Sequence, residues 1–150
     1  MSKLRLTMYT DFSLRVLLYL GVKGDGKLST IQEISDAYKI SKNHLTKVTH
    51  DLGKMEIIET VRGRGGGIRL KLKPSAINIG TIIRKTEEDF HLVECFNCAT
   101  NQCVITPSCK LKGVLHEALD AYLKVLDSYT LADFVENNDG LASILFGKTL

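Results

Sequence analysis

The most restrictive feature of this sequence is a pair of short amphipathic segments separated by a tight turn. Apolar residues recur at helical spacing from Ile31 to Ala37, and Ser29 or Thr30 is suited to cap this helix. Ser41 is a third candidate cap, for a helix that is expected to end near Lys54. Two short helices joined in this way predict a helix-turn-helix, a motif that places its second helix in the major groove of DNA.

A glycine-rich hairpin is predicted directly after this motif. Residues 57–61 (IIETV) and 68–72 (IRLKL) suit two short strands, and the segment RGRGGG lies between them. A phosphate-binding P-loop is the competing interpretation of so many glycines, but it requires a Lys-Ser or Lys-Thr pair and a following helix. Here a strand follows, so the hairpin is typical of the wing of a winged helix-turn-helix domain, which we place in residues 1–75.

Seven side chains of this region have the chemistry expected of a DNA interface. Cations would neutralise phosphates and make binding salt-sensitive, whereas polar groups near the start of the second helix are placed to reach base edges. The alternative is that they are ordinary exposed residues and that the hairpin contacts nothing. The candidates are the cations Lys42, Lys47, Arg62 and Arg64 and the polar residues Asn43, His44 and Thr46.

The charge of the chain is divided unevenly between its halves. Residues 1–73 carry 14 Lys and Arg against 7 Asp and Glu, whereas residues 74–150 carry 6 against 10. The first half therefore suits a polyanionic partner such as double-stranded DNA, although a solvated basic face would give the same count. The apolar run from Phe12 to Val22 is short and interrupted by Arg15, so we expect a cytoplasmic protein with no membrane partner.

Helices are predicted on either side of the winged domain. A buried helix capped by Thr10 is expected over residues 11–23, and a linking helix over residues 77–85. Residues 110–127 repeat apolar positions in alternating steps of four and three, which is typical of a coiled-coil seam. We expect this long helix to form a homodimer, with the first helix also packing in the dimer; the alternative is that it covers its own core.

The resulting fold is mainly α with a small β-hairpin, a winged helix-turn-helix domain plus a long dimerisation helix. Residues 76–110 would hold the linking helix and a cysteine loop. Residues 111–150 would hold the dimerisation helix and the C-terminal helices, with a final helix at 131–135 and apolar cover from 141–146.

All four cysteines lie in the segment ECFNCATNQCVITPSCK, at positions 95, 98, 103 and 109. In a reducing compartment such spacing indicates metal binding or redox sensing more than structural disulfides. Zinc held by all four thiols and a metal-free thiol switch through Cys98 both stay open. The four histidines are scattered and no catalytic arrangement is evident, so an enzyme is not expected.

Several motifs together resemble one family. TDFSLRVLLYL, SKNHLTKV, RGRGGGIRL and INIGTIIRKTE occur in this order before the cysteine loop and long helix, as in the iron-sulfur winged-helix transcription repressors. The resemblance covers nearly the whole chain and implies a homodimeric repressor of a palindromic operator, whose cluster state sets DNA affinity. One branch of the family has a histidine three residues after the last cysteine; here Lys112 occupies that position, which indicates the nitric-oxide-sensing branch.

The resemblance also implies a ligand set. Cys95, Cys103 and Cys109 match the three family cysteines, and [4Fe-4S] is favoured over [2Fe-2S] as the cluster. Three thiolates leave one iron with an exchangeable ligand at which nitric oxide can attack. The fourth ligand would be Asp11 of the partner subunit or Cys98, which is additional to the family pattern. Asp11 could instead stabilise the first turn of its helix, Cys98 could be a resolving thiol or a bystander, and iron or redox state is the alternative signal.

Overall fold

The computed structural model describes residues 5–24 and 26–147, so the outer ends of the first and last predicted segments lie outside the described residues. Its first half consists of α1 (Met8–Lys23), α2 (Ile31–Tyr38), α3 (Lys42–Lys54), β1 (Ile58–Val61) and β2 (Gly67–Leu70). The strands pair in antiparallel register, with Ile58 opposite Leu70 and Val61 opposite Gly67. The predicted helix-turn-helix and wing are therefore confirmed; each strand is one residue shorter than expected, and the second begins one residue earlier and ends two residues earlier.

Local chemistry explains where the helices of the helix-turn-helix begin. Thr30 and Glu33 form a capping box, in which each side chain accepts a hydrogen bond from the other residue's backbone N–H, at 3.1 and 3.0 Å. Lys39 ends α2 in the left-handed region, with φ of 57°, and so makes the tight turn. Ser41 occupies the cap position of α3 as predicted, but its side chain makes no capping bond.

The start of α1 differs from the prediction. Thr7, not Thr10, caps the helix and accepts a hydrogen bond from the Thr10 N–H at 3.2 Å. The prediction of Thr10 was wrong because both threonines carry the capping hydroxyl and periodicity does not separate them. Thr10 is instead fully buried inside the helix, and its hydroxyl oxygen lies 2.8 Å from Thr86 Oγ1, within hydrogen-bond distance.

The second half contains α4 (Ile79–Thr86), α5 (Lys110–Asp127), α6 (Ala132–Val135) and α7 (Asp139–Phe146). The linking helix begins two residues later than predicted because Asn78 caps it, accepting from the Thr81 N–H at 3.0 Å. Residues 141–146, predicted only as apolar cover, belong to α7. No helix within the described residues is long and apolar enough to cross a membrane.

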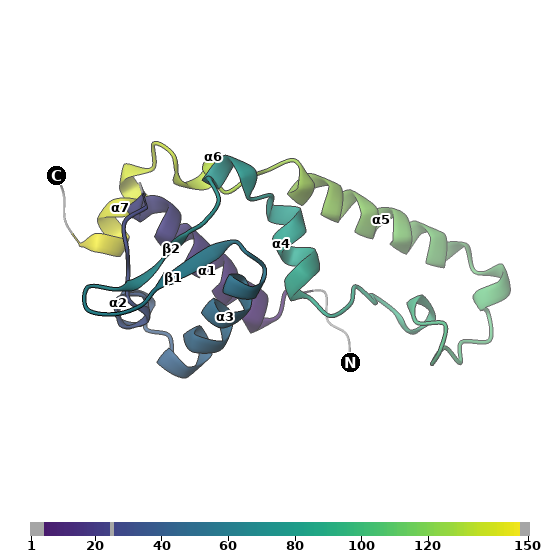
Figure 1. Ribbon diagram of the computed structural model, residues 1–150. Helices are drawn as coiled ribbons and strands as arrows, with labels where there is room; N and C mark the ends of the chain where they lie inside the picture. Colours follow the sequence, from purple (N-terminus) through teal and green to yellow (C-terminus); the bar gives the residue numbers. More distant parts are fainter. Residues whose placement is uncertain (1–4, 25, 148–150) are drawn as a thin grey trace.

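The core is built around α1, which contacts α3, α4, α6, α7 and β2. Its Val16 and Leu17 are fully buried, as are Ile34 of α2 and Leu45 of α3. By contrast α5, which contacts α4, projects from the body, and the cysteine loop runs out beside it and returns at its N-terminal end (Figure 1). The fold thus separates a packed winged half from an extended arm that carries the cysteines.

Candidate DNA interface and cysteine site

Helix α3 presents a polar face to solvent. Leu45, Val48, Thr49 and Leu52 are buried, and most of the other residues of this helix are exposed. The exposed residues include all five predicted on this helix: Lys42, Asn43, His44, Thr46 and Lys47. The Thr46 hydroxyl donates to the Lys42 carbonyl at 2.8 Å, which leaves its oxygen free to accept.

The wing tip is a tight turn that carries Arg62 and Arg64, and both side chains are exposed. Gly63 has φ of 99°, and the Gly66 N–H donates to the Gly63 carbonyl at 3.0 Å. A β-carbon at Gly66 would collide with the Val61 carbonyl oxygen. The glycines therefore allow a compact, hydrogen-bonded tip that exposes two arginines, and the tip is not a loose loop.

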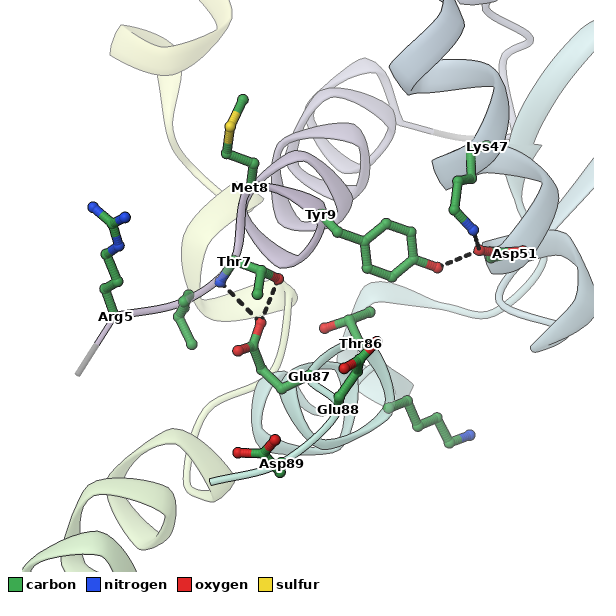
Figure 2. A pocket seen from close by; sticks show the side chains of 12 residues that line it. Arg5, Thr7, Met8, Tyr9, Lys47, Asp51, Thr86, Glu87, Glu88 and Asp89 are labelled. Carbon is green, nitrogen blue, oxygen red and sulfur yellow. Dashed lines mark hydrogen bonds and ion pairs between the residues drawn. The ribbon is translucent and has the colours of Figure 1, made fainter. Parts of the chain in front are cut away.

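Lys47 is restrained by two neighbours. Its ammonium lies 3.2 Å from Asp51 Oδ2 and 5.3 Å from the centre of the Tyr9 ring. The Tyr9 hydroxyl donates to the same Asp51 oxygen at 2.5 Å, so α1 and α3 are joined beside a predicted DNA contact (Figure 2). Burial and the bond to Asp51 raise the pKa of Tyr9 to about 12, and the same bond helps hold the pKa of Asp51 below its ordinary value.

Glu87 connects the end of α4 to the start of α1. Its carboxylate accepts hydrogen bonds from the Thr7 N–H at 3.0 Å and from the Thr7 hydroxyl at 2.6 Å (Figure 2). It also accepts a hydrogen bond from the Thr10 hydroxyl. Burial alone would raise the pKa of Glu87, but the bonds from Thr10 and Thr7 outweigh it and hold the pKa below its ordinary value.

This junction lines an open cavity of about 1240 Å³, bounded by the start of α1, by Lys47 and Asp51 of α3, and by residues 85–89. The sequence pattern indicated only that acidic residues end α4. No local signal identifies Glu87 as a functional residue, because its partners lie 77 to 80 positions away.

Asp11, a candidate fourth ligand, is paired within its own helix. Its two carboxylate oxygens accept from Arg15 at 3.0 and 2.8 Å, and about half of its side chain is exposed. The Arg15 guanidinium also lies over the rings of Phe12 and Tyr38, at 5.6 and 5.9 Å. Asp11 is therefore held in a fixed direction at the surface, and any ligand role for it would involve sharing or releasing Arg15.

The four cysteines are free thiols that differ in exposure. Cys95 is buried in a 3₁₀ turn (Glu94–Phe96), Cys109 is half-buried at the position before α5, and Cys98 and Cys103 are exposed. Within residues 5–24 and 26–147, no three His, Cys, Asp or Glu side chains lie close enough to hold a metal ion. The donors suit iron-sulfur chemistry, and the loop must close further for one cluster to bind three of them.

The chain has a helix-turn-helix, a hairpin directly after α3, and a projecting helix. This arrangement is that of a winged-helix DNA-binding regulator. The chain belongs to the Rrf2 family, described as an iron-dependent transcriptional regulator, which matches residues 6–137. The resemblance predicted from the motifs is thus confirmed, and the chain is a transcription regulator rather than an enzyme.

Similarity to known regulators extends over nearly the whole chain. The HTH-type transcriptional regulator NsrR of Shouchella clausii is 56% identical over 146 residues, covering 97% of this chain and 98% of its own. NsrR of Bacillus subtilis is 56% identical over 142 residues, covering 95% and 97%. Among solved structures, T. potens IscR shares the fold, with a TM-score of 0.69, 24% identity and coverage of 91% of this chain and 90% of that one.

Proposed function

We propose that the chain is a cytoplasmic, homodimeric repressor that senses nitric oxide through an iron-sulfur cluster held by Cys95, Cys103 and Cys109. The observation that carries this proposal is the match over about 97% of the chain to NsrR of Shouchella clausii, together with a cysteine loop that lacks the histidine of the other branch. Cluster nitrosylation or loss would release the operator.

The exposed face of α5 supports the homodimer. Leu111, Val114 and Val125 have 61, 56 and 58% of their surface exposed, and Leu123 is the helix's one buried residue. An apolar stripe on a projecting helix is stabilised when a second copy covers it. Two such chains would present two α3 helices to a palindromic operator.

The exposed residues of α3 and the wing support the DNA contacts. Arg62 and Arg64 lie at the wing tip, where they can reach phosphates or the minor groove. Lys42 and Lys47 would bind phosphates, and Asn43, His44 and Thr46 would face base edges. In this arrangement the cations supply affinity and the three polar residues supply sequence preference.

Contacts inside the chain support a route from the cysteine loop to DNA. The loop begins beyond Glu87, which is bonded to Thr7 and Thr10 of the α1 N-terminus. Tyr9, between those two threonines, is bonded to Asp51 of α3. A movement of the loop that displaced Glu87 would therefore act on α1 and, through Tyr9, on α3, which carries the proposed DNA contacts.

The cluster, proposed as [4Fe-4S] with [2Fe-2S] as the alternative, would supply an iron atom without a thiolate, at which a diatomic ligand can bind. Asp11 of the partner or Cys98 would complete the coordination. Asp11 suits an exchangeable ligand because its carboxylate is half exposed, and it would share or release Arg15 on binding iron.

The ligand assignment is tested by the visible spectrum and the iron and sulfide content of anaerobically purified protein. We expect a coloured wild type, colourless Cys95→Ala, Cys103→Ala and Cys109→Ala variants, and a coloured Cys98→Ala variant. A colourless wild type that contains zinc would establish the structural-zinc alternative, and a metal-free one the thiol switch. A coloured protein that responds to iron supply but not to nitric oxide would establish the iron-responsive alternative.

A further inference from the structure

Two cysteine-bearing parts of the loop are joined by a carboxylate. The Gln102 N–H donates to Glu94 Oε2 at 2.6 Å. Glu94 directly precedes Cys95, and Gln102 directly precedes Cys103. One charge-assisted hydrogen bond therefore limits how far the backbone at these two cysteines can separate.

The backbone of Cys103 is held on both of its sides. Its N–H donates to Asn101 Oδ1 at 3.0 Å, and its carbonyl accepts from the Thr106 hydroxyl at 2.8 Å. Asn101 Nδ2 in turn donates to Thr106 Oγ1 at 2.9 Å. The Cys103 thiol is exposed, but it projects from a hydrogen-bonded turn rather than from a free chain.

A stacked pair of rings joins the loop to α5. The rings of Phe96 and His116 lie 3.9 Å apart with an interplanar angle of 6°. Phe96 directly follows Cys95, and His116 lies two helical turns beyond Cys109, which precedes the first residue of α5. The stack thus connects the segment of Cys95 to α5, the helix that directly follows Cys109.

We propose that Glu94 and the Phe96–His116 pair are positioning residues for the cluster. Gathering three thiols from a mobile segment of fifteen residues would lose chain entropy on binding. Contacts that tie the Cys95 region to the Cys103 region and to α5 leave less of the loop to be ordered when the thiols converge, and they slow the opening by which a cluster escapes. This inference rests on the proposed function, because it assigns roles to residues around the proposed ligands.

The test compares Glu94→Ala and His116→Ala with the wild type, and Glu117→Ala is the matched control. Glu117 is exposed on α5 next to His116, and its replacement removes the same charge as Glu94→Ala. After anaerobic reconstitution with ferrous iron and sulfide, loss of cluster absorbance to a chelator is followed. We expect loss about three- to tenfold faster in the two test variants and unchanged in the control.

Conservative replacements separate positioning from general damage. His116→Tyr keeps a flat ring for Phe96, and Glu94→Gln keeps an acceptor for Gln102, so both should return to within about twofold of the wild-type rate. Amide hydrogen exchange of residues 97–109 in the cluster-free protein gives a second measurement. Glu94→Ala should speed exchange in this segment, while the thermal unfolding curve followed by far-ultraviolet circular dichroism should not change.

The positioning role would be overturned if the alanine variants lost the cluster at the wild-type rate. It would also be overturned if the conservative variants lost the cluster as fast as the alanine variants do. If the wild type itself takes up no cluster, the proposed function fails and this inference fails with it. If the wild type binds a cluster and the variants lose it at the wild-type rate, only the positioning role is refuted, and the proposed function stands.

Discussion

Glu87 shows how much one side chain can contribute to the arrangement of the molecule. Its carboxylate binds the first turn of α1 at the point where α4 gives way to the segment leading to the cysteines. Because these bonds are made to the charged form, its pKa is below the ordinary value of 4.5, and folding favours the ionised group.

A pH-dependent stability is expected from this group. Its contribution is fully present above pH 4.5 and is lost as the pH falls through the lowered pKa of the folded protein. Glu87→Gln should therefore lower the free energy of unfolding by about 1 kcal/mol at neutral pH, and the difference should shrink as the solution becomes more acidic than pH 4.5.

Urea unfolding at several pH values measures this difference. Glu88→Gln is the control, because Glu88 is the exposed neighbour, and its effect should stay below about 0.5 kcal/mol. If Glu87→Gln lowers the free energy of unfolding by the same amount at every pH, the hydrogen bonds from Thr7 and Thr10 do not depend on the charge of Glu87, which would contradict this prediction.

At the scale of the elements, the sequence predicted local structure well and contacts between elements poorly. Periodicity and the Ser41 cap position located α3, and periodicity alone located α5, at their observed bounds, because both signals depend on neighbouring residues. The Glu87 bonds and the Phe96–His116 stack have no such signal, since they depend on how elements far apart in sequence meet. For the same reason Thr10 was assigned as a cap when it is a buried partner of Thr86.

The contact between α4 and the end of α5 depends on Gly80. A β-carbon there would collide with the Asp127 carboxylate and lie 2.9 Å from the Asp127 backbone nitrogen. Asp127 is also paired with Arg84, and its carbonyl accepts from Asn78 Nδ2 at 2.7 Å. A larger residue at position 80 must therefore move the base of the arm.

Gly80→Ala should lower the free energy of unfolding by about 1–3 kcal/mol through overpacking. Gly113→Ala should raise it by about 0.5–1 kcal/mol, because Gly113 lies inside α5 with nothing within 4 Å of an added β-carbon. Thermal and urea unfolding of the two variants provide the comparison. Stabilisation by both would show that α4 and α5 do not approach closely.

The wing can be tested by its salt dependence. Replacing Arg62 and Arg64 together by alanine should flatten the plot of log affinity against log salt concentration by about two in slope, if each arginine neutralises one phosphate. Lys124→Ala is the control, since Lys124 lies in the last turn of α5. An unaltered slope in the double variant would mean that the wing does not touch DNA.

At the scale of the whole molecule, the proposed dimer joins the two functions of the chain. The winged half packs around α1, whereas α5 projects away from that core (Figure 1). The apolar stripe lies on this projecting helix. If two copies meet along α5, a change in the cysteine loop can alter the spacing of the two α3 helices.

Val125→Glu should separate the protomers, because it places a charge in the apolar stripe. Sedimentation should then report a monomer, and affinity for a palindromic site should fall by about a hundredfold as bivalent binding is lost. Ile144→Glu is the matched control, since Ile144 is 80% exposed on α7 and lies outside the stripe. A dimeric Val125→Glu protein would place the interface elsewhere.

The central claim, that the state of a cysteine-bound cluster sets DNA affinity, is tested most directly by a band shift under anaerobic conditions. Cluster-loaded protein is titrated against a palindromic operator selected from random-sequence DNA, before and after stoichiometric nitric oxide, beside Cys103→Ala. We predict that nitric oxide and the Cys103 substitution each weaken binding by about tenfold or more. Equal affinity in all three samples would contradict the account.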